Sequence, residues 1–224
     1  MTLARPLTLL LLVATTLSTF AVEPVTPLVL PFFDSADLSP RWADDSGEGP
    51  APGSHRIGDF QFTNQQNQTV TRADLLGSIH VADFFFTSCP GICATLTRNL
   101  KRVQDATEGR DVALISYSVT PRMDTPEVLA AYALRFGVDN KRWHLTTGDK
   151  EATYALARES YFADGLKNQG KGSETFLHTE NLFLVDAQGR IRGVYNGTRA
   201  TDVTRLIEDI AHLRAEMQDT ATPR

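Results

Sequence analysis

Two patterns of hydrophobic residues alternate along residues 56–213: continuous apolar runs, and apolar residues spaced three or four positions apart. Runs that are apolar at nearly every position, typical of strands buried on both faces, occur at 78–87 and 112–119. Other segments repeat apolar residues every three or four positions, as Leu96, Leu100 and Val103 do, which indicates helices packed by one face. The pattern predicts these elements in order: a hairpin at 60–71, a strand at 78–87, a helix at 94–107, a strand at 112–119, a helix at 125–137, a strand at 142–147, a helix from 149 to about 162, a hairpin of strands 182–185 and 191–195, and a final helix from 201.

Capping residues support the predicted helix boundaries. Thr125 precedes Pro126 and Glu127, which is a typical N-terminal sequence of a helix, and Gly137 follows its last turn. Asp149 and Thr201 stand where the next two helices should begin. These signals place helices between the strands.

Strands that alternate with helices predict an α/β domain with parallel strands and right-handed crossovers. The closing hairpin and last helix make this order thioredoxin-like. We therefore expect a thioredoxin-like fold, with a central mixed sheet flanked by helices and an N-terminal β-hairpin. Strand 182–185 should run antiparallel to strand 78–87.

The first 21 residues have the features of an export signal. Arg5 is the single charge, an apolar run covers 7–13, and Thr19 and Ala21 are small residues suited to signal peptidase cleavage. An uncleaved membrane anchor is the alternative, although the polar residues among 15–19 shorten the run below the roughly 20 residues of a spanning helix. We expect residues 1–21 to be a signal peptide or anchor, 22–54 an extended N-terminal arm, and 55–219 the thioredoxin-like domain. The protein should be exported, to the periplasm or the outer face of the cytoplasmic membrane.

The charge composition of the chain bears on whether it binds nucleic acid. The chain has 22 basic and 27 acidic residues, a net charge of −5, and no Lys/Arg-rich stretch. A nucleic-acid partner is therefore not expected. The hydrophobic content of 42% is that of a packed globular protein.

The two cysteines, Cys89 and Cys93, lie between a predicted strand and a predicted helix. A helix N-terminus stabilises a thiolate and lowers its pKa. The spacing i, i+4 can place both sulfurs on one face, where two soft thiolates suit copper(I) and an added imidazole also allows copper(II). The alternative is a structural Cys89–Cys93 disulfide, but a bridge that closes so short a loop stabilises a protein little.

A third ligand must come from one of five histidines. His178 precedes strand 182–185, whose start should meet the end of strand 78–87, so the fold brings it to the edge that carries the cysteines. An ordinary loop histidine is an equal alternative from topology alone. The other four are expected elsewhere: His55 and His212 in solvent, and His80 and His144 as satisfied residues of the core.

Four segments together span most of the predicted domain: FFFTSCPGIC (84–93), SVTPRMDTPEVLAAYALRFG (118–137), WHLTTG (143–148) and LHTENLFLVD (177–186). They resemble the Sco/SenC family, which are exported thioredoxin-like copper proteins that help assemble the dinuclear copper centre of cytochrome c oxidase. The resemblance implies one copper ion per chain, with Cys89, Cys93 and His178 as its ligands. It also implies a copper-accepting subunit of cytochrome c oxidase and a thiol reductant as partners, with membrane proximity through residues 1–21.

Two positions depart from the family pattern. Thr120 stands where many members have Asp before Pro, and Ala94 follows the second cysteine where Pro is frequent. The first departure removes a carboxylate near the site and bears on copper transfer. Neither departure changes the three expected ligands.

A copper metallochaperone is the leading hypothesis, and it is not an enzyme of the usual kind. The alternative is a thiol–disulfide oxidoreductase that keeps a partner's copper-binding cysteines reduced with the same redox-active pair. Thioredoxin-type enzymes have Cys-x-x-C and a cis-proline, whereas this spacing is one residue longer and residues 179–181 contain no proline. A peroxidase is disfavoured because Phe86 replaces the expected Thr. A structural bridge in an interaction domain is the redox-inactive alternative.

Overall fold

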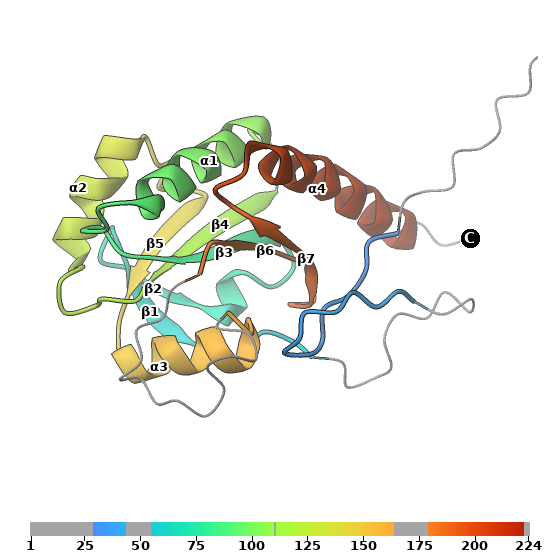
Figure 1. Ribbon diagram of the computed structural model, residues 1–224, viewed down its shortest axis with the longest axis horizontal. Coiled ribbons are helices and arrows are strands. Elements are labelled where there is room, and N and C mark those ends of the chain that lie inside the picture. The colour runs from blue at the N-terminus through green and yellow to red at the C-terminus, as the bar shows by residue number, and fades with distance from the viewer. Residues whose placement is uncertain (1–28, 44–54, 110, 164–178, 222–224) are drawn as a thin grey trace, which may run out of the picture.

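The computed structural model describes residues 29–43, 55–109, 111–163 and 179–221 of the 224-residue chain. Its centre is a seven-stranded mixed sheet in the order β2-β1-β5-β4-β3-β6-β7. Helices α1, α2 and α4 lie over one face of the sheet and α3 lies on the other (Figure 1). The predicted α/β thioredoxin-like architecture is confirmed. No helix within the described ranges is long and apolar enough to cross a membrane.

The elements follow the predicted order. Strands β3 and β4 pair in parallel, as do β4 and β5, whereas β6 runs antiparallel to both β3 and β7. The antiparallel hairpin β1–β2 extends the sheet through a pairing with β5. The bounds are β1 Gln61–Asn64, β2 Thr69–Thr71, β3 Ile79–Phe85, α1 Ile92–Ala106, β4 Val112–Ser118, α2 Pro126–Phe136, β5 Trp143–Thr147, α3 Lys150–Ala155, β6 Asn181–Val185, β7 Ile191–Asn196 and α4 Ala200–Ala221, with a 3-10 turn at Arg72–Asp74.

The caps of α2 and α3 form as the sequence indicates. The Thr125 hydroxyl accepts a hydrogen bond from the N–H of Val128 at 3.4 Å, and the Asp149 carboxylate accepts one from the N–H of Ala152 at 2.8 Å. Gly137 ends α2 with φ 67°, a left-handed conformation that glycine adopts without a steric cost. Local side-chain chemistry therefore sets these helix ends.

Three helix boundaries differ from the expectation. Helix α1 begins at Ile92, two residues before the expected start at 94. The helix predicted from Asp149 to about Phe162 is α-helical only to Ala155 and continues as a π-helical turn, Leu156–Ser160. Phe162 then takes a φ of 52°, which ends the helical path. Helix α4 begins at Ala200, so Thr201 lies inside its first turn and is not the cap.

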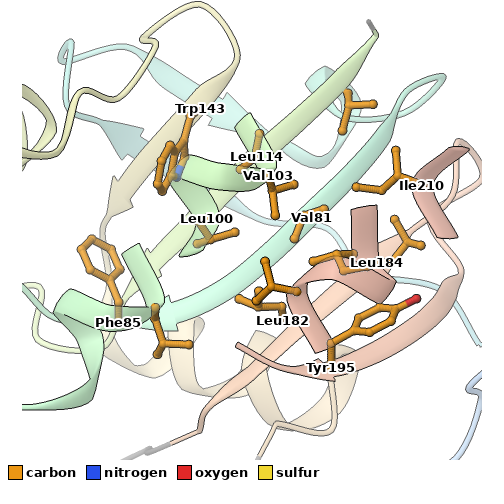
Figure 2. Packing of buried hydrophobic residues seen from close by; sticks show 14 of the residues in the cluster. Val81, Phe85, Leu100, Val103, Leu114, Trp143, Leu182, Leu184, Tyr195 and Ile210 are labelled. Atoms are coloured by element: carbon orange, nitrogen blue, oxygen red, sulfur yellow. The ribbon is translucent and has the colours of Figure 1, made fainter. Parts of the chain in front are cut away.

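The sheet is buried on both faces, which explains why most residues of β3 and β4 are apolar. Figure 2 shows the core beneath α1 and α4. Leu100 and Val103 of α1 belong to the same buried cluster as Val81, Leu184 and Trp143 of the sheet. Cys93 is part of this cluster and is only 4% exposed. The helices that cover this face therefore hold one of the two cysteines inside the core.

Part of the predicted arm packs against the sheet. Leu30 and Phe32 are buried, and the arm runs beside β7 and the end of α4 (Figure 1). The guanidinium groups of Arg190 and Arg192 lie 4.8 and 4.1 Å from the centroid of the Phe32 ring. Arg192 also donates to the Leu30 carbonyl at 2.7 Å. Residues 29–43 thus contribute to the packing of the fold, while the domain boundaries at 21 and 54 remain predictions.

Candidate metal and redox site

Cys89 and Cys93 lie where β3 leads into α1. Strand β3 ends at Phe85, and α1 begins at Ile92 after the N-cap residue Gly91. Cys89 is partly exposed in the loop, Cys93 is buried in the first helical turn, and both are free thiols. The predicted strand-to-helix position of the pair is confirmed.

The Cys89 sulfur lies close to the first N–H groups of α1. Gly91 has no side chain to accept hydrogen bonds from the first N–H groups of the helix. Partial burial raises the pKa of Cys89, but hydrogen bonds from the Cys93 thiol and from the N–H groups of Cys93, Gly91 and Ile92 outweigh burial and lower the pKa. The helix terminus therefore favours the thiolate form of Cys89.

The Cys93 thiol has the opposite character. Burial, together with the hydrogen bond to Cys89, raises the pKa of Cys93 to about 12. The Thr97 hydroxyl donates to the Cys93 carbonyl at 2.9 Å and is 2.8 Å from the Tyr132 hydroxyl, so this part of α1 is tied to α2. The pair thus combines one accessible, acidic thiol with one fixed, buried thiol.

The third expected ligand, His178, lies outside the described residues. Strand β6 pairs antiparallel with β3 through His80↔Val185 and Ala82↔Phe183, as predicted. Its first residue, Asn181, therefore lies toward the end of β3 that leads to Cys89. Among the described residues no group of three or more His, Cys, Asp or Glu side chains could hold a metal ion.

The other four histidines are away from the pair. His212 is exposed on α4 and His80 is buried in β3, as expected, but neither ring nitrogen of His80 makes a well-formed hydrogen bond with the described residues. The expectation that His80 is satisfied is thus wrong. His144 is half-buried, with Nδ1 3.2 Å from the Asn64 amide. The solvent position expected for His55 is also wrong, because its Nε2 is 2.6 Å from the Ser160 carbonyl oxygen and its ring packs on Phe162.

Asp124 is a site residue that the sequence analysis did not identify. Its carboxylate is fully buried beside the cysteine loop and accepts hydrogen bonds from Thr87, Ser118 and Thr120. Thr87 and Thr120 each follow the last residue of a strand by two positions, and these two strands, β3 and β4, are parallel neighbours. The sequence signal for this cluster was a threonine at the same position after each of two neighbouring parallel strands.

Asp83 is a second residue that the sequence analysis missed. It is 1% exposed on β3, on the same face as Val81 and Phe85, and its Oδ1 lacks a hydrogen-bond partner among the described residues. Burial raises the pKa of Asp83 to about 7, and its negative charge adds to the raised pKa of Cys93. An acidic residue inside a strand that is otherwise apolar except for His80 was the signal.

Comparisons with known proteins agree with this arrangement. A SCO1/SenC lipoprotein from Bacillus anthracis has a crystal structure that matches with a TM-score of 0.63 and 31% identity, over 71% of this chain and 95% of that one. BsSco, a Sco-family cytochrome c oxidase assembly protein with a disulfide switch, matches with a TM-score of 0.61 and 28% identity, over 73% and 96%. Copper-bound ScoI of Bradyrhizobium japonicum matches with a TM-score of 0.56 and 25% identity, over 70% and 99%. The sequence model of SCO1/SenC matches residues 48–215, three quarters of the chain. The chain therefore belongs to the SCO1/SenC family.

Proposed function

We propose that this chain is a copper-binding metallochaperone that assists assembly of the dinuclear copper centre of cytochrome c oxidase. It holds one copper ion with Cys89, Cys93 and His178. The observation that carries the proposal is the pair of free thiols at the start of α1, one accessible and one buried. A buried thiol on a packed helix is a fixed ligand, and an accessible thiol in a loop can release or accept a metal.

The donor set suits copper. Two thiolates four residues apart are soft ligands that prefer copper(I), and imidazole is a ligand for copper(II). Metal binding requires both thiols to lose their protons. The N–H groups at the start of α1 already lower the pKa of Cys89, while a bound cation must offset the raised pKa of Cys93.

His178 is supported by the topology. The antiparallel pairing of β6 with β3 directs the chain that precedes Asn181 toward the cysteine loop. Position 178 is only three residues before Asn181, a length of at most about 10 Å, so the topology supports a ligand at this edge of the sheet. The family also includes the copper-bound ScoI structure.

The same proposal includes location and partner. An exported protein in the periplasm or on the outer face of the cytoplasmic membrane would meet an oxidase subunit whose copper site is assembled there. The features of residues 1–21 and the lipoprotein relative support this location. Cell fractionation and N-terminal sequencing test it: we expect protein outside the cytoplasm that begins near Val22, whereas membrane-bound protein that retains Met1 would instead support an anchor.

Copper content of the reduced, purified chain tests the ligand set. One copper per chain is expected, and Cys89→Ser, Cys93→Ser and His178→Ala should each weaken copper retention against a competing chelator. His212→Ala, which alters an exposed histidine on α4, is the matched control and should retain copper like the wild type. Full retention of copper by His178→Ala would contradict the proposed third ligand.

A thiol–disulfide oxidoreductase remains the second candidate, because the unequal thiols favour it specifically. A lowered pKa makes Cys89 the attacking thiolate, and the buried Cys93 can then resolve a mixed disulfide. His178→Ala separates the two functions, since disulfide exchange needs only the thiols. In cells that lack the protein, His178→Ala should fail to restore copper loading of the oxidase if the chaperone function holds. Full restoration by His178→Ala, with none by Cys89→Ser, would favour the oxidoreductase.

A further inference from the structure

The Asp124 carboxylate is held by four donors. Oδ1 accepts from the Thr87 hydroxyl at 2.5 Å, and Oδ2 accepts from the hydroxyls of Ser118 at 2.5 Å and Thr120 at 3.0 Å. The Thr87 N–H is shared between both oxygens, at 3.4 and 3.3 Å. Asp124 is 0% exposed, so these groups replace its contacts with water. The carboxylate is thus the centre of a closed hydrogen-bond cluster.

The direction of these bonds is constrained. A backbone N–H can only donate, and the Ser118 hydroxyl oxygen already accepts from the Thr120 N–H at 3.1 Å, which directs its proton toward Asp124. No ion pair joins Asp124 to a basic side chain within the described ranges. Buried carboxylates are costly unless their oxygens are fully hydrogen-bonded. The cluster therefore strongly favours the arrangement in which the Asp124 oxygens accept all of these hydrogen bonds.

The hydrogen bonds of Asp124 hold the start of the cysteine loop, which connects the end of β3 at Phe85 to the start of α1 at Ile92. Thr87 is two residues from Cys89, and the Cys89 N–H makes a long bond of 3.4 Å to the Phe86 carbonyl. Cys93, in contrast, is fixed by the packing of α1 in the core. The separation of the two sulfurs therefore depends on how the segment from Thr87 to Cys89 is held.

We propose that Asp124 is a positioning residue for the cysteine pair, acting through its two hydrogen bonds with Thr87. The Thr120 hydroxyl donates to Oδ2 of Asp124, whereas the Thr87 hydroxyl donates to Oδ1. An aspartate at position 120 would instead place a second carboxylate beside Asp124. The hydroxyl at this position thus leaves the Asp124 charge free to bind Thr87.

The inference rests on the proposed function because it treats the pair as the working site, but its test does not involve copper. The reduced chain is equilibrated with mixtures of oxidised and reduced glutathione. Formation of the Cys89–Cys93 disulfide removes two electrons and two protons from the protein, and one glutathione disulfide becomes two glutathione thiols. A held loop raises the effective concentration of one thiol at the other, which favours the disulfide.

Thr87→Val removes the hydroxyl bond at a partly exposed position, and Asp124→Asn alters the acceptor itself. Each variant should lower the equilibrium constant for disulfide formation by about tenfold, which corresponds to about 30 mV. Thr87→Ser, which keeps the hydroxyl, should stay within about twofold of the wild type. Thr120→Val is the matched control: it removes one donor from the same carboxylate but leaves Thr87 bound, so it should reduce stability without moving the redox constant.

A folded Thr87→Val with a wild-type equilibrium constant would overturn the inference, and so would an equal shift in Thr120→Val, because either result reduces the cluster to a structural role. If Asp124→Asn does not fold, the comparison of Thr87→Val with Thr87→Ser decides. A wild-type chain that binds no copper, together with the expected shift in Thr87→Val, would refute the copper function and support the positioning role. The two failures are thus distinguishable.

Discussion

His80 and Asp83 should make opposite contributions to the pH dependence of folding stability. Both side chains are buried in β3, at 3% and 1% exposure, and neither forms an ion pair within the described residues. Burial lowers the pKa of His80 from 6.5 to about 4 and raises the pKa of Asp83 from 3.8 to about 7. The two groups therefore titrate in overlapping pH windows with opposite preferences.

The sign of each contribution follows from proton counts. Between pH 3.8 and 7 the folded chain keeps a proton on Asp83 that the unfolded chain has lost, so this contribution to stability falls as pH rises. Between pH 4 and 6.5 the unfolded chain binds a proton on His80 that the folded chain does not, so this contribution falls as pH decreases. Each proton is worth about 1.4 kcal/mol per pH unit, and the two slopes cancel from about pH 4 to 6.5.

Asp83→Asn should expose the slope that His80 contributes. Relative to the wild type, the free energy of unfolding of this variant should rise by about 4 kcal/mol between pH 4 and 7, as the buried carboxylate is replaced by a neutral amide of similar shape. His80→Gln should show the reverse, with stability that falls toward pH 7. Asp59→Asn, which alters a carboxylate that is 91% exposed, is the control and should parallel the wild type.

Urea unfolding of the reduced, copper-free chain measures these differences. Fluorescence of the buried Trp143 reports the transition, and linear extrapolation at half-unit steps from about pH 4 to 7.5 gives the free energy of unfolding. Curves for Asp83→Asn and the wild type that stay parallel within about 0.5 kcal/mol would refute the reasoning, because they would mean that Asp83 has the same proton affinity in the folded and unfolded chains.

Three further predictions concern the packing and the thiols. Iodoacetamide should modify Cys89 much faster than Cys93 at pH 7.5, as peptide mass mapping would show, and equal rates would contradict the unequal burial of the two thiols. Gly197→Ala should destabilise the fold by about 1–3 kcal/mol in urea unfolding, because an added Cβ would lie 2.7 Å from the Leu182 side chain; an unchanged midpoint would show that the contact relaxes freely. Phe32→Ala should cost about 3 kcal/mol in the same assay if the arm is part of the core, and a loss below about 0.5 kcal/mol would contradict that packing.

The sequence by itself determined the order of the elements and the position of the cysteine pair, because these depend on local signals. Apolar runs define β3 and β4, and capping side chains such as Thr125 and Asp149 satisfy N–H groups only a few residues away. The antiparallel direction of β6 follows from the order of strands and helices in a sheet of this kind. These features depend on residues close together in the chain, so they can be predicted without knowledge of the tertiary structure.

The tertiary structure decided the chemistry of the individual groups. The residue type does not distinguish Cys89 from Cys93. Hydrogen bonds at the start of α1 lower the pKa of Cys89, whereas burial in the core raises the pKa of Cys93. Asp124 meets Thr87 across 37 positions of the chain, because β3 and β4 end side by side. Burial and hydrogen bonding are properties of the assembled fold, and they fix the charge and the position of a side chain that its residue type leaves open.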